Sequence, residues 1–254
     1  LFRSGVCYRL WDAAGEGAME PFSPPEILSA DLSGLVLDCA AWGANPDQLA
    51  WLDPPPRPAV QEARTLLRTL GALDGANRLT SEGQELRSLA LPPRLSCMVV
   101  AAATMGLGSL AAEIAAILTE RGLGGDRVNL VERIENFRRD RSARAMAMRK
   151  LCRSWAQAVG AAKAHESLAQ VGRVLALAFP DRVALARGRP GFFVMENGRG
   201  ANIEPHDALG RERFLVIAEL AGSAQASHIL LAAPIDPSEI EALSGLTVET
   251  ITEF

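Results

Sequence analysis

The sequence predicts an α+β, multidomain protein in which a winged-helix-like unit and an all-helical bundle precede an antiparallel β unit. Apolar residues recur with helical spacing as far as about residue 178, and one hairpin signal interrupts them. From about residue 182, short apolar runs alternate with Gly, Asn, Asp and Pro turns, which is typical of antiparallel strands. A chain of 254 residues is long enough for two or three domains with cores of their own.

The first predicted element is a short strand over residues 5–11, a run of β-forming residues. Ser23 can cap a helix with Pro24 at its first position, and the apolar spacing continues this helix to about Gly43. The Pro-rich joint at residues 53–58 follows. We expect this joint to be neither helix nor central strand.

The elements after this joint complete a small unit. Apolar spacing over residues 60–70 predicts a second helix, and the turn at residues 75–77 predicts a hairpin. Ser81 and Gln84 can form a capping box for a third helix. Because helix, helix, hairpin and helix follow one another closely, we expect a winged-helix-like domain over residues 21–90.

Residues 91–180 predict an all-helical bundle. It begins with a helical hairpin over residues 92–120 that turns at Gly106 to Gly108, and its last helix ends before Pro180. Between them, the helical spacing of Leu130, Ile134 and Phe137 predicts the start of another helix. After a polar stretch, the same spacing continues at Met148, Leu151, Trp155 and Val159.

Residues 181–254 predict a β unit of at least four antiparallel strands. The apolar runs lie at residues 192–195, 214–219, 229–233 and 246–251. The last run stops inside an apparent strand, so we expect this unit to be incomplete.

Composition excludes several classes of protein. Apolar residues make up 48% and charged residues 22%, the balance of a soluble globular protein. The Ala-rich residues 97–118 are interrupted by glycines and Glu113, so we expect no membrane-spanning helix. The start of the chain lacks the basic region of a signal peptide. Because the net charge is −4, nucleic-acid binding would need a local basic face.

The cysteines and histidines predict neither a zinc site nor a disulfide framework. The cysteines lie at 7, 39, 97 and 152 without a C-x-x-C pair, and the histidines lie far apart at 165, 206 and 228. Reduced thiols in apolar surroundings are therefore expected. Neither His165 nor His206 has a nucleophile motif nearby. The tryptophans at 11, 42, 51 and 155 are expected in the core rather than as stacking platforms.

A match to the dinucleotide-binding pattern occurs at Gly106-x-Gly108-x-x-Ala111, with Asp126 further on. The preceding run is rich in Ala and Met rather than β-branched residues, and Asp126 precedes the next apolar run instead of ending a strand. We therefore interpret these glycines as a turn between helices.

Several short motifs occur in order along the chain. They are Pro25-Glu26-Ile27-Leu28, Leu49-x-Trp51-Leu52-Asp53-Pro54-Pro55, Leu70-Gly71-Ala72-Leu73 and Leu91-Pro92-x-Arg94-Leu95. Together with residues 5–11 they resemble the C-terminal part of DEAH-box ATP-dependent RNA helicases. The segments at 178–184, 197–201 and 231–236 resemble the HrpB group of that family. Each motif alone is weak, but the order of the set is specific.

The resemblance implies a role for each part of the chain. Residues 1–20 would be the tail of the second RecA-like domain, residues 91–180 a ratchet-like bundle, and residues 181–254 an OB-like domain. The chain would be a cytoplasmic accessory region that guides single-stranded RNA for unwinding, with RNA and its own motor domains as partners and no membrane contact.

The resemblance does not extend to a motor. Leu1-Phe2-Arg3 does not reproduce the arginine finger, and Ser4 stands where the family usually has Pro. The chain has no G-x-x-x-x-G-K-[ST] loop and no Asp-Glu-x-His box, which ATP phosphates and Mg²⁺ require. We therefore expect no ATPase activity and no cofactor in this chain, and ATP with Mg²⁺ only in the parent helicase.

A basic run between residues 133 and 153 is the main candidate for RNA contact. It holds eight cations against Glu135 and Asp140, a surplus of six, as phosphate binding requires. The alternative is a solvated helix face with internal ion pairs. The candidate contact residues are Arg133, Arg138, Arg139, Arg141, Arg144, Arg149 and Lys150, and Arg153 completes the basic run.

Arg199 is a second candidate, because the flanking Gly198 and Gly200 let a backbone approach a ligand closely. A plain hairpin turn explains the same residues. For the chain as a whole, the alternative function is a protein-interaction platform with no RNA contact, which the acidic composition favours slightly.

Overall fold

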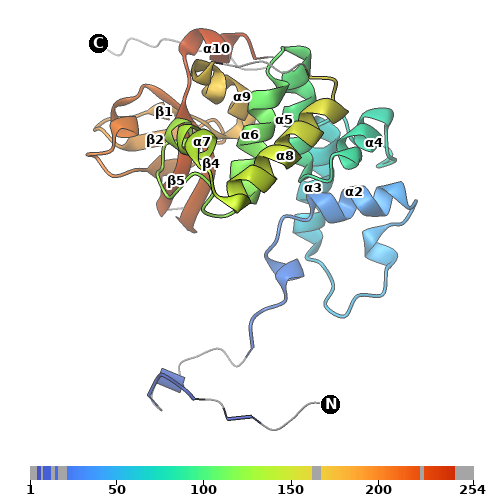
Figure 1. The fold of residues 1–254 in the computed structure, drawn as a ribbon. Helices are drawn as coiled ribbons and strands as arrows, with labels where there is room; N and C mark the ends of the chain where they lie inside the picture. The colour runs from blue at the N-terminus through green and yellow to red at the C-terminus, as the bar shows by residue number, and fades with distance from the viewer. Residues whose placement is uncertain are drawn as a thin grey trace.

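The computed structural model describes residues 5–6, 8–12, 15–16, 22–161, 167–223 and 226–243. A mixed helical unit, a helical bundle and a small barrel of strands follow one another along the chain (Figure 1). The predicted strand at residues 5–11 is wrong for the residues described there, since none of them is in a strand. Tyr8 and Leu10 are 85% and 93% exposed, so no partner strand covers them.

The first unit consists of η1 (Glu26–Leu28), α2 (Ser33–Ala41), η2 (Pro46–Gln48), α3 (Arg57–Thr69) and α4 (Ser81–Ser88). The prediction of one helix from Pro24 to Gly43 is wrong, because it breaks into η1 and α2. Asp31 Oδ1 accepts a hydrogen bond of 2.8 Å from the Ser33 backbone N–H, which gives α2 a start of its own. The predicted end of the helix near Gly43 is confirmed, because α2 ends at Ala41 and Gly43 has a φ of +71°.

Three details of this unit correct the prediction. Helix α3 begins at Arg57 and accommodates Pro58 in its first turn, where the missing N–H has no helical partner anyway. Thr80 rather than Ser81 caps α4, because Thr80 Oγ1 accepts a 2.9 Å hydrogen bond from the Gly83 N–H. The predicted hairpin contracts to a single bridge between Leu73 and Leu79.

The bundle consists of α5 (Pro93–Thr104), α6 (Gly108–Thr119), α7 (Leu130–Arg139), α8 (Ala143–Ala158) and, after η3 (Leu168–Gln170), α9 (Val171–Ala178). The predicted hairpin α5–α6 is confirmed. Helices α7 and α8 are separate, because Ser142 Oγ accepts a hydrogen bond from the Ala145 N–H and starts α8. The predicted core residues of α7 are fully buried, whereas Leu151 of α8 is 40% exposed and was wrongly expected inside.

After η4 (Pro180–Arg182), five strands close into a barrel of order β1-β2-β3-β5-β4. They are β1 (Val183–Ala186), β2 (Phe192–Met195), β3 (Gly200–Asn202), β4 (Phe214–Ser223) and β5 (Ala226–Pro234), with η5 (Ala208–Arg211) before β4 and α10 (Pro237–Glu241) at the end. Strands β1 and β3 were not predicted. Nor is the unit wholly antiparallel, since β3 pairs with β5 in parallel. The predicted run at residues 246–251 lies outside the described residues.

One hydrophobic core joins the bundle to the barrel. Leu175 of α9 and Ile114 of α6 belong to the same buried cluster as Val216 of β4 and Ala233 of β5. A second cluster fills the interior of the barrel, and a third lies within the first unit. Among the described residues, no helix has the length and apolarity that crossing a membrane requires.

Helix α9 lies directly against the barrel at Gly172. A Cβ atom placed there would lie 2.0 Å from the carbonyl oxygen of Pro234, far inside van der Waals contact. Gly172 therefore lets the helix backbone reach the strand backbone, and any side chain would separate them.

We expect Gly172→Ala to lower the free energy of unfolding by about 1–3 kcal/mol, because the added methyl overpacks this contact. Urea denaturation measures the change. Gly34→Ala in α2 is the matched control, since a Cβ there meets nothing within 4 Å. It should leave stability unchanged or raise it by up to about 1 kcal/mol. Equal midpoints for Gly172→Ala and the unmodified chain would show that α9 does not lie this close.

Candidate nucleic-acid interface

The basic run folds into α7, the following turn and α8, and part of it is used inside the bundle. Arg138 of α7 donates two hydrogen bonds to Glu113 Oε2 of α6, 2.9 Å from Nε and 2.6 Å from Nη2. Their side chains are only 25% and 19% exposed. This ion pair therefore joins α7 to α6 at a site that is partly shielded from water.

Three further cations of the run also bond within the bundle. The Arg144 guanidinium lies 2.5 Å from both Glu120 Oε1 and the carbonyl oxygen of Arg121. Arg149 Nη1 donates to the carbonyl oxygen of Phe137 at 2.6 Å, and its guanidinium lies 5.5 Å from that ring. Arg133 Nε donates to the carbonyl oxygen of Arg127. These contacts satisfy the Phe137 carbonyl in the last turn of α7 and the loop carbonyls of Arg121 and Arg127.

The remaining cations project into solvent. Arg139 is 76% exposed and lies 3.6 Å from Glu135. Within the described part of the chain, the exposed side chains of Arg141, Lys150 and Arg153 have no hydrogen-bond or ion-pair partner. We call Arg139, Arg141, Lys150 and Arg153 the open cations. The ranges described therefore contain both expected arrangements, internal pairs and an open basic face.

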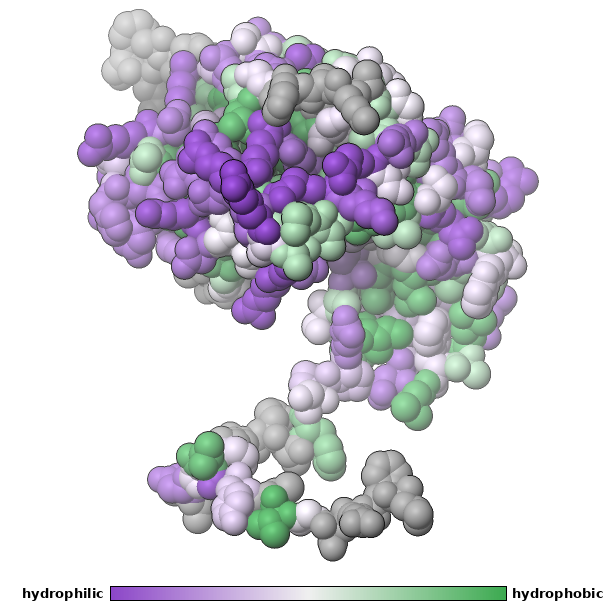
Figure 2. Space-filling model, viewed as in Figure 1, coloured by the Kyte–Doolittle hydropathy of each residue, from purple (hydrophilic) through white to green (hydrophobic). Residues whose placement is uncertain are grey.

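Lys150 and Arg153 lie three residues apart and share one face of α8. Ala143, Met146 and Ala147 continue this face toward the start of the helix, and all three are exposed. Helix α8 runs along the front of the bundle in Figure 1, and hydrophilic residues cover much of that side in Figure 2. Because the side chains between the cations are mostly small, an extended polymer can approach the helix closely.

One acid stays charged within this surface. Asp140 accepts hydrogen bonds from the Ser142 backbone N–H and hydroxyl. These bonds, with Arg149 and Arg144 nearby, hold the pKa of Asp140 below its ordinary value. Asp140 thus fixes the turn between α7 and α8, and its negative charge offsets part of the positive charge of Arg144 and Arg149.

Arg199 lies in the turn between β2 and β3. Asn197 Oδ1 accepts a 3.1 Å hydrogen bond from the Arg199 N–H, and Gly198 has φ of +79°. The turn interpretation is confirmed, while the Arg199 side chain remains exposed and its contact with RNA remains a prediction.

Sequence reasoning missed a second group of arginines at one end of the barrel. The β1–β2 loop carries Arg187 and Arg189, and the segment before β4 carries Arg211 and Arg213. Hydrogen bonds join the segments, including 2.9 Å from the Gly191 N–H to the Gly210 oxygen. All four arginines are exposed, and none has an ion-pair partner among the described residues. The only hint of this group in the sequence was the pair Arg187 and Arg189 on either side of Gly188.

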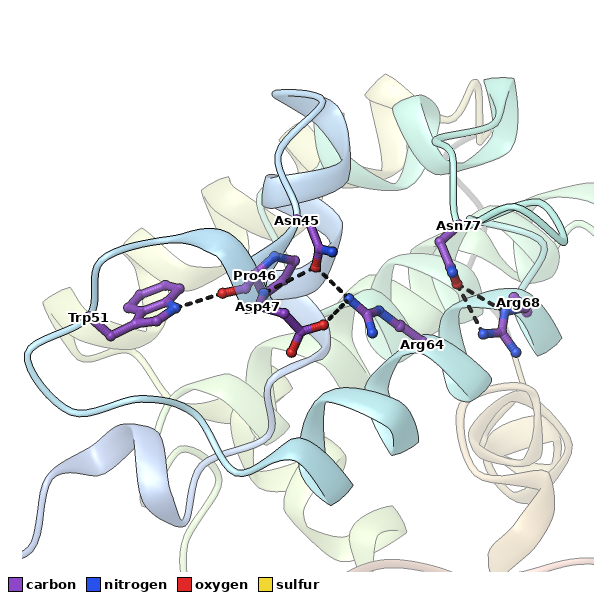
Figure 3. Close-up of polar contacts among 7 residues, drawn as sticks. All are labelled: Asn45, Pro46, Asp47, Trp51, Arg64, Arg68 and Asn77. Atoms are coloured by element: carbon purple, nitrogen blue, oxygen red, sulfur yellow. Dashed lines mark hydrogen bonds and ion pairs between the residues drawn. The ribbon is translucent and has the colours of Figure 1, made fainter.

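A cleft of about 660 Å³ lies on the first unit, with Trp42 and Arg64 in its lining. Arg64 is buried and bonds Asn45 Oδ1 at 2.8 Å and Asp47 Oδ2 at 3.0 Å, while Trp51 Nε1 donates to the Pro46 oxygen (Figure 3). The tryptophans therefore divide: Trp155 is in the core as predicted, Trp51 is half-buried, and Trp42 is 82% exposed against expectation. Trp11, 49% exposed, also contradicts the prediction.

The run before Gly106 is helix α5, so the interpretation of a helix–helix turn is confirmed. The described residues contain no group of three His, Cys, Asp or Glu placed to hold a metal. Asp207 caps η5 and His228 Nδ1 lies 3.0 Å from Asn202 Oδ1, whereas His165 lies outside the described residues.

We expect Arg138→Ala to lower the free energy of unfolding by about 1–3 kcal/mol, because it leaves the partly buried Glu113 carboxylate without its partner. Lys150→Ala is the control and should stay within about 0.5 kcal/mol of the unmodified chain. Chemical denaturation compares the two. If Lys150→Ala destabilised the chain as much as Arg138→Ala, the division into internal and open cations would be wrong.

Comparisons with known proteins find relatives among ATP-dependent RNA helicases. No family model matches it. It is 38% identical over 222 residues to the ATP-dependent RNA helicase HrpB of Escherichia coli (strain K12), covering 86% of this chain and 26% of that protein. The probable ATP-dependent RNA helicase DHX34 of Mus musculus is 32% identical over 116 residues, 45% of this chain and 10% of that protein.

Solved structures agree with these relatives. A crystal structure of the E. coli DExH-box NTPase HrpB matches with a TM-score of 0.75 and 33% identity, over 90% of this chain and 28% of that one. A crystal structure of the Escherichia coli DEAH/RHA helicase HrpB gives a TM-score of 0.74 and 32% identity, over 88% and 28%. The chain thus spans about a quarter of the HrpB proteins that it matches. Over this shared length the chain is similar in both sequence and fold to the HrpB type of DEAH-box RNA helicases.

Proposed function

We propose that this chain is the accessory region of an ATP-dependent RNA helicase and guides single-stranded RNA along α8. The observation that carries the proposal is the set of open cations on α7, the turn and α8. A folded protein usually pairs or disperses its surface charges, whereas here like charges gather beside small side chains. Such a surface suits a phosphate backbone, which binds through charge and releases counterions.

The division of the basic run supports this role. Arg138, Arg144 and Arg149 hold the helices in place, so the open cations are displayed on a fixed surface. Phosphate contacts position a strand without selecting its sequence. A rigid basic face could thus hold RNA while ATP-driven motor domains push the strand along, and it would oppose backsliding.

The chemistry of ATP belongs to the rest of the parent helicase. This chain has neither a G-x-x-x-x-G-K-[ST] loop nor an Asp-Glu-x-His box, the motifs that hold ATP phosphates and Mg²⁺. We propose that motor domains elsewhere in the parent bind ATP and Mg²⁺ and contact this region. We also place the parent in the cytoplasm.

We further propose the three-domain division predicted from the sequence, with a winged-helix-like unit at 21–90, a ratchet-like bundle at 91–180 and an OB-like unit at 181–254. The closed five-stranded barrel with β3 beside β5 supports the OB-like assignment. The two helices, short bridge and following helix of the first unit support the winged-helix assignment.

A second candidate function is a protein-interaction platform without RNA contact. Trp42 and Leu52 of the first unit favour it, because they are 82% and 100% exposed and large exposed apolar side chains mark interaction sites. A partner retained from nuclease-treated lysate by the unmodified chain but not by Trp42→Ser, together with no RNA binding, would support the platform over RNA guiding.

We expect the triple change Arg141→Ala, Lys150→Ala and Arg153→Ala to weaken binding of single-stranded RNA and to flatten its salt dependence. For three lost phosphate contacts, the slope of log affinity against log salt should fall by about 2. Fluorescence anisotropy with a labelled single strand at several salt concentrations measures this.

The matched control removes the same charge from the first unit, through Arg57→Ala, Arg68→Ala and Arg78→Ala. Its affinity and salt slope should stay close to those of the unmodified chain. Equal losses in the two triple variants would show that RNA responds only to net charge, and α8 would then not be its path.

A further inference from the structure

A hollow of about 160 Å³ lies between α6 and α8, beside the open cations. Ser109 and Glu113 approach it from α6, one turn apart. Cys152 and Ala156 of α8 form its apolar wall, and Arg153 and Gln157 also line it. The hollow therefore combines an apolar wall with a charged and polar edge.

The size of this hollow fits a single six-membered ring. A cavity of about 150 Å³ with apolar walls is large enough to bind benzene. The wall stays uncharged because burial, with Glu113 nearby, raises the pKa of Cys152 to about 12. The thiol is oriented toward the Ala112 carbonyl oxygen at 3.4 Å. A flat ring can therefore pack against Cys152 and Ala156, because neither side chain carries a charge.

The polar edge of the hollow favours an amino group on that ring. Arg138 directs its two shortest hydrogen bonds at Glu113 Oε2 and reaches Oε1 only at 3.2 Å. A carboxylate has about four acceptor positions, so Glu113 keeps acceptor capacity toward the hollow. Among pyrimidine bases, cytosine carries an amino group that donates to carboxylates.

We propose that this hollow binds a cytosine base of a single-stranded RNA. Glu113 accepts from the amino group, the ring lies on Cys152 and Ala156, and Arg153 holds the adjoining phosphate. The inference rests on the proposed function, since a strand along α8 brings bases to this position. It adds a preference for base type to a surface that otherwise holds only the backbone.

The test compares three labelled single strands of equal length on the 254-residue chain: oligocytidine, oligouridine and an abasic strand. We expect oligocytidine to bind at least about tenfold tighter than oligouridine, the effect of one additional hydrogen bond to a charged group, and the abasic strand to bind weakest. Glu113→Gln should remove the preference for cytosine, because its amide oxygen turns toward Arg138 and its NH₂ faces the hollow. The salt slope should not change.

Glu120→Gln is the matched control, since Glu120 is also on α6, pairs with Arg144 and does not line the hollow. It should keep the cytosine preference. Thermal melting of both variants confirms that each is folded. Equal affinity of the unmodified chain for all three strands overturns the base site while RNA guiding stands.

Two other outcomes also decide against the base site. Free cytidine monophosphate binding as tightly as oligocytidine would make the hollow a mononucleotide site rather than a part of the RNA path. Absence of binding to any strand, at low salt, would remove the proposed function together with this inference.

Discussion

The direct packing of α9 on the barrel is the constraint on which the rest of the structure depends. At Gly172 the helix backbone reaches the Pro234 carbonyl, and the neighbouring apolar residues of α9 belong to one core with β4 and β5. Because interiors are close-packed, bundle and barrel keep a fixed relation. The cations of α8 and those at the barrel end are therefore displayed by one body, which the proposed RNA guide requires.

Within this body, the arginines have two tasks. The partly buried Arg138 pairs with Glu113, whose carboxylate would otherwise be buried without a partner. The charge of Arg138 therefore stabilises the contact between α7 and α6. Exposed pairs such as that of Arg139 contribute little to stability, so charge at those positions remains available to a ligand. The same basic run thus stabilises the fold and provides the face that we propose for RNA.

Helices and strands with a regular apolar period could be predicted from the sequence. Elements that form only when the barrel closes could not. The 3.6-residue period gave α5, α6 and α7 and the burial of Ile134, and the apolar runs gave β2, β4 and β5. Strand β3 is three residues long and pairs with β5 only when the barrel closes, so no local pattern marks it. For the candidate site, the sequence showed the surplus of positive charge. It did not show that Arg138 forms an ion pair with Glu113, which lies on an earlier helix.

Mapping the RNA contacts tests the central claim most directly. A single strand carrying a photoreactive uridine would be crosslinked to the chain at moderate salt, and the attached peptides identified by mass spectrometry. Guiding along α8 predicts crosslinks concentrated between residues 139 and 158, with others at the arginine-rich end of the barrel. Crosslinks confined to residues 22–90, or absent from α8, would contradict it.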